Sequence, residues 1–356
     1  MKSRRSKIWI AVAVAIIAAA IAGAVVLRKH AAPEPARLLS DGDAILYVNL
    51  KPVRAFSNFG KEPPRTGDPE YQNFINQTGF VFERDLEEAA VAVHGELAGA
   101  MGPETAVPTT RFSWVFVGHF NADRLTKYLK ILSNDTDQYR GVTVYSIPLQ
   151  GRTVRVGILS VDTVAASNLD GSQDLHGMID RYRASALPFG GPRLVRDYYS
   201  HVPIGSVAWS ILRTTTAGEH SSPFLPGNIS LFMPANTTIV TSARVLTSVH
   251  VKAELFTQKE ADAKRFKSQM DVFFALFKSV EGSVNAGGND RDVKAVFDNI
   301  KVEQNGANAS LSAVIPFDFF KKLLAETPSE VAPQPAPATV IPPSKAVPAP
   351  SKKKAR

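Results

Sequence analysis

The sequence predicts an α+β fold in which a unit of antiparallel strands and covering helices occurs twice behind an N-terminal transmembrane helix. Three observations predict it. Alternating apolar runs typical of half-buried strands are followed by apolar stripes typical of helices. The same strand–helix pattern returns in the second half of the chain, and an uninterrupted apolar run lies close to the N-terminus.

The recurring pattern is clearest in residues 114–131 (WVFVGHFNADRLTKYLKI) and 249–266 (VHVKAELFTQKEADAKRF). Each apolar run ends on a phenylalanine, Phe120 or Phe256, and a charged helix follows. The residues between are N-cap types, Asn121 and Thr257. We therefore predict a duplicated body. The alternative is chance, because any α+β protein can show strand-then-helix twice.

The first α+β unit is expected over 38–190. Its elements follow from turn residues and periodicity: a strand in LLSDGDAILYVNL behind Asp41-Gly42-Asp43, and a helix between Pro69 and Gly79. Next come a helical turn feeding a strand at about 89–94, a strand at 113–120 and a helix at 122–133. A hairpin turning at Gln150–Gly151, a strand in 162–168 and a helix capped by Ser172 complete the unit.

The second unit is expected over 191–327 and repeats this order. A short helix at 192–200 precedes the strand in PIGSVAWSIL, and strands follow at 237–245 and 247–256. The Thr257–Glu260 segment has the spacing of a capping box. Asn305–Gly306 predicts a type I′ hairpin turn, and FDFFKKLLAE closes the unit as an amphipathic helix. If the duplication holds, two antiparallel sheets each carry helices on one face.

The apolar run Ile8–Leu27 contains 20 residues without a charge. At about 1.5 Å per residue it spans about 30 Å, the thickness of the hydrocarbon core. Four basic residues precede the run and two follow it, an asymmetry that favours a cytoplasmic N-terminus and an extracytoplasmic body. Residues 1–30 are therefore predicted as cytoplasmic N-terminus and membrane anchor. Cleavage as a signal peptide near Ala22-Gly23-Ala24 is the alternative.

The net charge of +8 is concentrated at the two ends of the chain. Residues 1–30 carry +6 and residues 328–356 carry +4, which leaves −2 for residues 31–327. A nucleic-acid groove needs basic residues on the folded domain, so no nucleic-acid partner is expected. The chain has no cysteine, which excludes disulfides and thiol chemistry.

Two segments are expected outside the folded units. Residues 31–37 (AAPEPAR) read as a short Pro/Ala tether, and residues 328–356 form a Pro-, Ala- and Lys-rich tail that cannot build a core. The favoured interpretation of the tail is a disordered segment that keeps the protein soluble. The alternative is contact with an anionic surface through Lys352, Lys353 and Lys354.

No motif with a known chemistry is present: HExxH, GxSxG, GxGxxG, Walker A and EF-hand patterns are all absent from the sequence. Weak candidates remain. His94 and His119 each end an expected strand and could become neighbours in a metal site. Carboxylates cluster at Asp85, Glu87 and Glu88 and again at Asp290 and Asp292.

For each of these candidates a structural role is favoured over a functional one, because histidines at strand ends and charged residues at the ends of elements are usually solvated. An apolar helix face formed by Phe266, Met270, Phe273, Phe274 and Phe277 could line a ligand pocket, although such a stripe is usually core. We therefore predict no catalytic residue, no cofactor-binding residue, no cofactor and no metal site.

The opening strand LLSDGDAILYVNL, the segment GFVFERDLEEAAVAV and the block VFVGHFNADRLTKYL…GVTVYSI together resemble uncharacterised bacterial membrane-anchored envelope proteins. The resemblance covers most of 38–185 and, more weakly, 200–325. It implies a single-pass inner-membrane protein with an extracytoplasmic body. No functional residue is carried over with it.

The expected function is non-catalytic binding or scaffolding with an unknown envelope partner. The alternative of another class is a carrier or sensor of an apolar ligand such as a lipid, and a carboxylate-dependent hydrolase ranks third.

Overall fold

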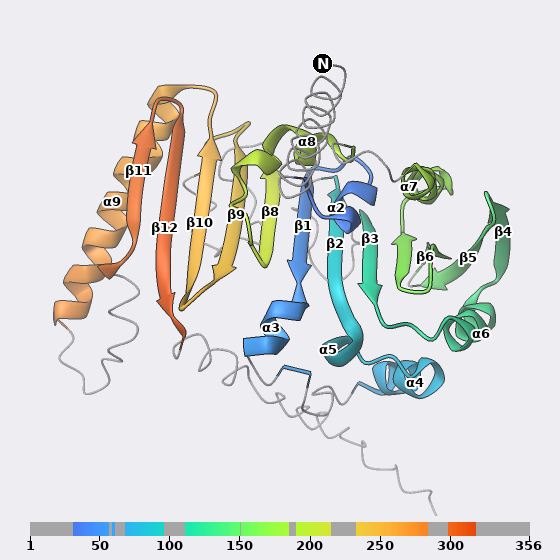
Figure 1. Ribbon diagram of the computed structural model, residues 1–356. Coiled ribbons are helices and arrows are strands. Elements are labelled where there is room, and N and C mark those ends of the chain that lie inside the picture. The colour runs from blue at the N-terminus through green and yellow to red at the C-terminus, as the bar shows by residue number, and fades with distance from the viewer. Residues whose placement is uncertain are drawn as a thin grey trace, which may run out of the picture.

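The computed structural model describes residues 31–56, 59–60, 68–95, 111–149, 151–184, 190–214, 233–283 and 298–317. The strands within these residues form a single 12-stranded sheet in which every pairing is antiparallel (Figure 1). The predicted α+β class is thus confirmed. The expectation of two separate sheets is wrong, because β1 (Ala44–Asn49) pairs directly with β8 (Ala208–Arg213) and joins both halves.

The first half builds one wing of the sheet, in the order β1-β2-β3-β7-β6-β5-β4. Its strands after β1 are β2 (Leu86–His94), β3 (Arg111–Gly118), β4 (Asp135–Tyr139), β5 (Val142–Leu149), β6 (Arg152–Ile158) and β7 (Thr163–Ser167). The helices are α2 (Glu34–Leu38), α3 (Leu50–Phe56), α4 (Pro69–Thr78), α5 (Phe82–Asp85), α6 (Ala122–Leu132) and α7 (Gln173–Arg183).

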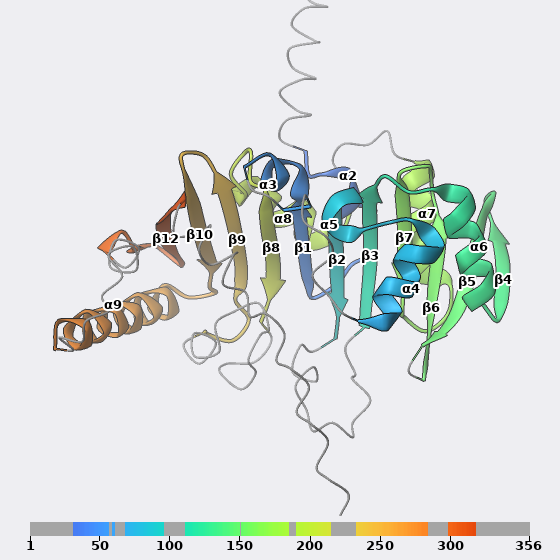
Figure 2. The same ribbon diagram turned by 90° about the horizontal axis from the view of Figure 1, so that it is seen from below.

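The second half builds the other wing, in the order β8-β9-β10-β12-β11. Its strands after β8 are β9 (Thr238–Val245), β10 (Ser248–Phe256), β11 (Lys301–Asn305) and β12 (Asn308–Pro316). Its helices are α8 (Arg193–Tyr198), the 3₁₀ turn η2 (Tyr199–His201) and α9 (Glu260–Ser283). Figure 2 shows the row of strands with α9 at one end and α4, α6 and α7 towards the other.

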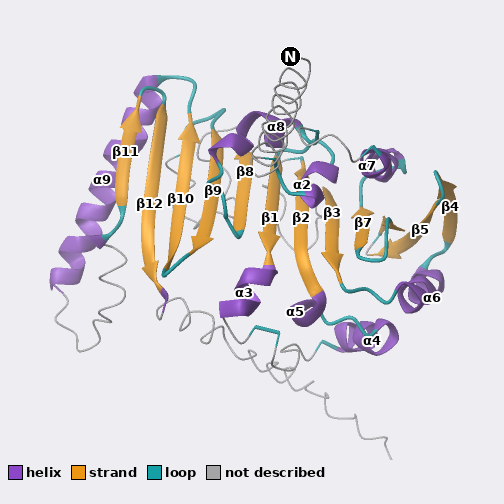
Figure 3. Cartoon of the chain, viewed as in Figure 1, coloured by secondary structure: helices purple, strands orange, loops and turns teal. Residues whose placement is uncertain are grey.

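Helices pack on both faces of the sheet (Figure 3). On the first face, called the α7 face, α2, α7 and α8 bury Leu38, Met178 and Leu194 against Ile45 and Ile211 of the sheet. On the opposite α9 face, α9 covers one wing and α4 and α6 cover the other. The α9 contacts are Ala263, Phe266 and Met270 on Leu212, Ile239 and Leu255, and α6 places Leu125 and Leu129 on Tyr145 and Val164.

Several predicted termini are confirmed by their capping contacts. Helix α4 begins at Pro69 behind Asp68, whose side chain accepts the Glu70 N–H, and ends before Gly79 at φ 75°. Glycine adopts this left-handed conformation without the clash of a Cβ, which is why it ends helices. Asn121 caps α6 by accepting the Arg124 N–H at 3.0 Å.

Two predicted caps and one turn are wrong. Ser172 makes no capping hydrogen bond to α7. Thr257 is no capping box, because its hydroxyl faces two carbonyl oxygens, of Ala307 at 2.6 Å and Lys259 at 2.9 Å, and so acts as a donor. In the β11–β12 hairpin the two connecting residues are Gly306 and Ala307, of which only Gly306 has a positive φ (58°). A type I′ turn needs two such residues, so the turn is of another type.

Strand β4 was not expected from the sequence. Its residues, DTDQY, show no apolar alternation, and the first four are exposed. It is an edge strand of the sheet, where charged side chains discourage pairing with another chain. Residues 31–37, expected as a tether, include most of α2, whose Ala36 is fully buried in the core.

Candidate functional site

A partly buried chain of polar side chains joins three elements of the first wing. His94, at the end of β2, places Nε2 2.7 Å from the Ser113 hydroxyl on β3. Ser113 Oγ donates to Asp174 Oδ2, in the first turn of α7, at 2.9 Å. Ser113 is 0% exposed, so the chain His94–Ser113–Asp174 runs through the interior between the sheet and α7.

This arrangement differs from a serine hydrolase triad. In such a triad the acid orients the histidine, which in turn deprotonates the serine. Here the carboxylate of Asp174 contacts the serine instead, and Ser113 has no surface through which a substrate would reach it. The three residues form a polar network between the sheet and α7.

Further charged groups surround His94. The carboxylates of Asp41 and Asp43, in the link between α2 and β1, and of Asp174 favour its protonated form, as does a hydrogen bond to the Asp41 backbone. Burial of the ring outweighs these contributions and lowers the pKa of His94 below its ordinary value. Arg181 of α7 binds the same link, donating to Leu38 O at 2.8 Å and Ser40 Oγ at 3.0 Å.

The two histidines proposed as metal-site neighbours do not meet. The register pairs His94 with Arg111, whereas His119 follows the opposite end of β3. There His119 Nε2 lies 3.2 Å from Glu87 Oε1. Among the residues that the structure describes, no three His, Asp or Glu side chains form a group suited to a metal ion.

The carboxylates of the first cluster are separated by their contacts. Asp85 accepts the Val81 N–H at 2.8 Å and a two-pronged contact from the Arg84 guanidinium at 2.7 Å. Burial acts to raise the pKa of Asp85, but Arg84 and the Val81 N–H outweigh it, so the pKa lies below its ordinary value. Glu87 pairs with Lys51 at 2.7 Å.

The third carboxylate, Glu88, accepts the Tyr47 hydroxyl at 2.8 Å. Burial and Glu88 together raise the pKa of Tyr47 far above its ordinary value. The Tyr47 ring stacks on Trp209, which Tyr199 meets edge-on with ring centroids 5.3 Å apart. The buried Nε1 of Trp209 has no hydrogen-bond partner in the described part of the chain.

A second polar region lies on the α7 face of the second wing, over strands β9 to β12. We call it the polar platform. Residues in register share a face, so Ser242, Lys252, Ser312 and Lys301 form one row across these four strands. The next rows are Glu254, Ser310 and Glu303 on one side and Arg244, His250 and Val314 on the other.

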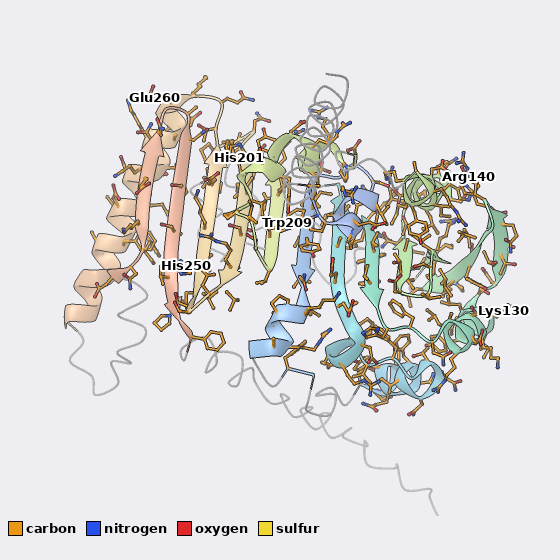
Figure 4. All side chains as sticks on the ribbon, in the orientation of Figure 1. Lys130, Arg140, His201, Trp209, His250 and Glu260 are labelled. Carbon is orange, nitrogen blue, oxygen red and sulfur yellow. The ribbon has the colours of Figure 1, made fainter. Side chains whose placement is uncertain are left out.

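The polar platform continues the aromatic part of the same face. Ser242 is the register partner of Trp209, which pairs in turn with Tyr47. His201 of η2 lies where the polar platform meets the aromatic residues. Its Nδ1 lies 3.3 Å from Glu254 Oε2, and the centroid of its ring lies 4.5 Å from that of Phe256. Figure 4 shows His201, Trp209 and His250 on this wing. Lys252 also pairs with Glu254, and the Lys252 side chain is 42% exposed.

The sequence carried a signal for the polar platform that was not used. In β10 the polar residues His250, Lys252 and Glu254 occupy every second position, which assigns them to one face of a strand. No comparable signal existed for Ser113 and Asp174, because they lie 61 residues apart on different elements.

The predicted apolar face of α9 packs on the sheet. Phe266 (2% exposed) and Met270 (0%) are core residues, as the structural interpretation expects, and Phe274 is partly buried against them. Val272 and Leu276, each 60% exposed, lie on the opposite side of the helix. The run from Val272 to Leu276 contains no charge.

Other predicted features lie outside the described residues: the anchor Ile8–Leu27, Asp290 and Asp292, the helix over FDFFKKLLAE beyond Phe317, and Lys352, Lys353 and Lys354. Within the part of the chain that the structure describes, no helix has both the length and the apolar composition to cross a membrane.

No protein-family model matches the chain, and no curated protein matches it in sequence. Among solved structures, crystal forms III, IV and I of TP0453 align with it. Form III has a TM-score of 0.42 at 11% identity and covers 83% of this chain and 98% of that one. Form IV has 0.41 at 10% and form I 0.39 at 11%, each covering 82% and 96%. Likeness at this level assigns neither a family nor a function.

Proposed function

We propose that the chain is a non-catalytic binding or scaffolding protein of a bacterial envelope, anchored by Ile8–Leu27 with its body outside the cytoplasm. The observation that carries the binding role is the polar platform. Its side chains stand on four hydrogen-bonded strands of a continuous sheet, so they are held in fixed positions before a partner arrives.

The size and chemistry of the polar platform suit a protein partner. Strands β10 and β12 have nine residues each, which gives a length of about 30 Å, and four strands give a width of about 15 Å. The resulting area of roughly 450 Å² is about half of what one partner contributes to a standard interface. The partner therefore also contacts adjoining residues such as His201. Hydroxyl, ammonium and carboxylate groups alternate on the platform, which favours a polar complementary surface.

The non-catalytic assignment rests on how the candidate acids and bases are used. Asp85 holds a helical turn, Glu87 pairs with Lys51 and His119, and Ser113 is enclosed by His94 and Asp174. Each of these groups is engaged in an internal contact that supports the fold.

We also propose that the body arose by duplication. From the central seam outward, the three strands β1, β2 and β3 correspond to β8, β9 and β10. A helix on the α9 face follows the third strand of each wing, and the last strand of each unit returns to pair with that third strand. Phe120 and Phe256 are not equivalent within this scheme, because Phe120 packs with α6 on the α9 face and Phe256 packs on the α7 face.

The binding role is tested by site-specific photocrosslinking in cells. A benzophenone side chain at Ser312, on the polar platform, is compared with one at Lys130, which is exposed on α6. The proposal expects a discrete crosslinked product from the Ser312 position and none of the same mass from Lys130. Absence of any product at Ser312, Lys252 and Lys301 would overturn it.

The second candidate function is carriage or sensing of an apolar ligand such as a lipid. It is favoured by Val272 and Leu276, two apolar side chains that are each 60% exposed on the side of α9 turned away from Phe266 and Met270. Native mass spectrometry of the full chain released from mild detergent decides it. A retained lipid that is lost in Leu276→Asp supports this candidate, and a bare chain in both proteins contradicts it.

A contact of Lys352, Lys353 and Lys354 with an anionic surface remains part of the proposal. Removal of residues 352–356 is expected to weaken binding to anionic vesicles and to leave binding to neutral vesicles unchanged.

A further inference from the structure

The hydrogen bonds of His94, Ser113 and Asp174 depend on which side chain carries a hydrogen to donate. A hydroxyl has one hydrogen to donate. Ser113 gives it to Asp174 Oδ2, because a carboxylate can only accept. At 2.7 Å from His94 Nε2, Ser113 Oγ must then accept, so Nε2 carries a hydrogen in this arrangement.

The second ring nitrogen of His94 is also engaged. The hydrogen bond between the ring and the Asp41 backbone favours the protonated histidine, so the ring donates and the Asp41 carbonyl accepts. Because Nε2 is directed at Ser113, we assign this contact to Nδ1. Both nitrogens donate at once only in the imidazolium form. The observed set of contacts is therefore complete when His94 is protonated.

Loss of one proton forces a rearrangement. A neutral His94 that keeps its Nδ1 hydrogen on the Asp41 carbonyl presents a lone pair at Nε2. Ser113 then donates to Nε2 and withdraws its hydrogen from Asp174. The hydroxyl thus has two acceptors, and the protonation of His94 decides between them.

We propose that His94, Ser113 and Asp174 form a proton-controlled hydrogen-bond switch between the sheet and the first turn of α7. In the protonated state Ser113 ties Asp174 of α7 to β3. In the neutral state this tie is released, and α7 is held at its other end, where Arg181 binds Leu38 and Ser40. The switch goes beyond the proposed binding role and operates whether or not a partner is bound.

The charged groups around the switch help to set the pH at which His94 changes its protonation. Asp41 and Asp43 of the α2–β1 link and Asp174 of α7 face the ring and favour its protonation, and burial opposes them. Arg181 also faces Asp174 and Asp41. Arg111, the register partner of His94, is paired with Asp170 at 2.6 Å. Because burial prevails, the change occurs on the acidic side of the ordinary histidine range.

The tautomer of neutral His94 tests the switch directly. Full-length protein in detergent micelles is labelled with ¹⁵N-histidine, and long-range proton–nitrogen spectra are recorded from pH 4.5 to 8. The switch requires neutral His94 to carry its hydrogen on Nδ1, and a midpoint below the ordinary histidine value. An Nε2–H tautomer above the midpoint would show that Ser113 stays on Asp174 throughout and would overturn the proposal.

A matched pair of variants adds a second readout. Asp174→Asn removes the charge that favours protonation and lowers the His94 midpoint further, while Asp170→Asn, in the exposed turn nearby, leaves it in place. Equal midpoints in the wild type and Asp174→Asn would contradict the coupling. If Asp174→Asn does not fold, the wild-type tautomer alone decides.

Discussion

Tyr47 and Trp209 are register partners across the β1–β8 pairing, and their rings stack with centroids 5.5 Å apart and planes inclined by 25°. This pair lies at the seam where the two wings of the sheet join. Tyr47 is 6% exposed and Trp209 is 4% exposed. The seam is thus held by aromatic packing in addition to the backbone hydrogen bonds of the strands.

Truncation of Trp209 tests the seam. Trp209→Ala is expected to lower the free energy of unfolding by about 3–5 kcal/mol, the usual cost of removing a large buried aromatic side chain. Trp209→Phe keeps a ring against Tyr47 and gives up only an Nε1–H without a described partner, so it costs less. Denaturant unfolding followed by circular dichroism measures both. Equal losses in the two variants would show that ring stacking contributes little.

Asp85 is expected to act in stability and not in chemistry. Asp85→Asn weakens the contacts to Arg84 and the Val81 N–H and lowers the free energy of unfolding by about 1–3 kcal/mol at pH 7. The folded-state pKa of Asp85 lies below its unfolded value of about 3.9, so its contribution is present above that pH and is lost as the pH falls through the folded pKa. Wild-type and variant stabilities should therefore converge below about pH 4. A constant difference down to pH 2 would refute the electrostatic account.

The two predicted N-caps of the first wing give a matched comparison. Asn121→Ala removes a capping acceptor from α6 and is expected to cost about 1 kcal/mol. Ser172→Ala removes a side chain that makes no capping hydrogen bond to α7, so its effect stays within about 0.5 kcal/mol. Thermal or denaturant unfolding of the two variants checks this order. Equal costs would mean that Ser172 caps α7 in solution.

Helix α9 is expected to be divided energetically as it is structurally. Phe266→Ala, at a position that is 2% exposed, should cost about 3–5 kcal/mol. Leu276→Ala, at a position that is 60% exposed, should change stability by no more than about 0.5 kcal/mol. Denaturant midpoints distinguish the two. A large loss in Leu276→Ala would show that this part of α9 is covered in the native protein.

Local sequence signals predicted the helices whose ends are marked by capping residues. Pro69 and Gly79 bounded α4, and Asn121 began α6. Strand β4 could not be predicted, because an exposed edge strand has no buried side chains to impose apolar alternation. The single sheet could not be predicted either, since the pairing of Tyr47 with Trp209 joins residues far apart in the chain and leaves no local sequence pattern.

The same distinction applies to the candidate sites. The polar platform could be predicted, because a period-two pattern in β10 assigns His250, Lys252 and Glu254 to one face. The network of His94, Ser113 and Asp174 could not, since it depends on how α7 packs against β3. The contacts of Asp85 with Arg84 and the Val81 N–H could not be predicted either, because they depend on the conformation of the turn.

The central claim, an anchored body outside the cytoplasm, is tested most directly by cysteine labelling. The chain has no cysteine of its own, so a single Lys130→Cys on the exposed surface of α6 reports on the body and Lys2→Cys reports on the N-terminus. Both variants are expressed in a bacterial host, and spheroplasts are treated with a membrane-impermeant maleimide before and after lysis. The account predicts labelling of Lys130→Cys in intact spheroplasts and of Lys2→Cys only after lysis. Protection of Lys130→Cys until lysis would place the body in the cytoplasm and contradict the proposed function.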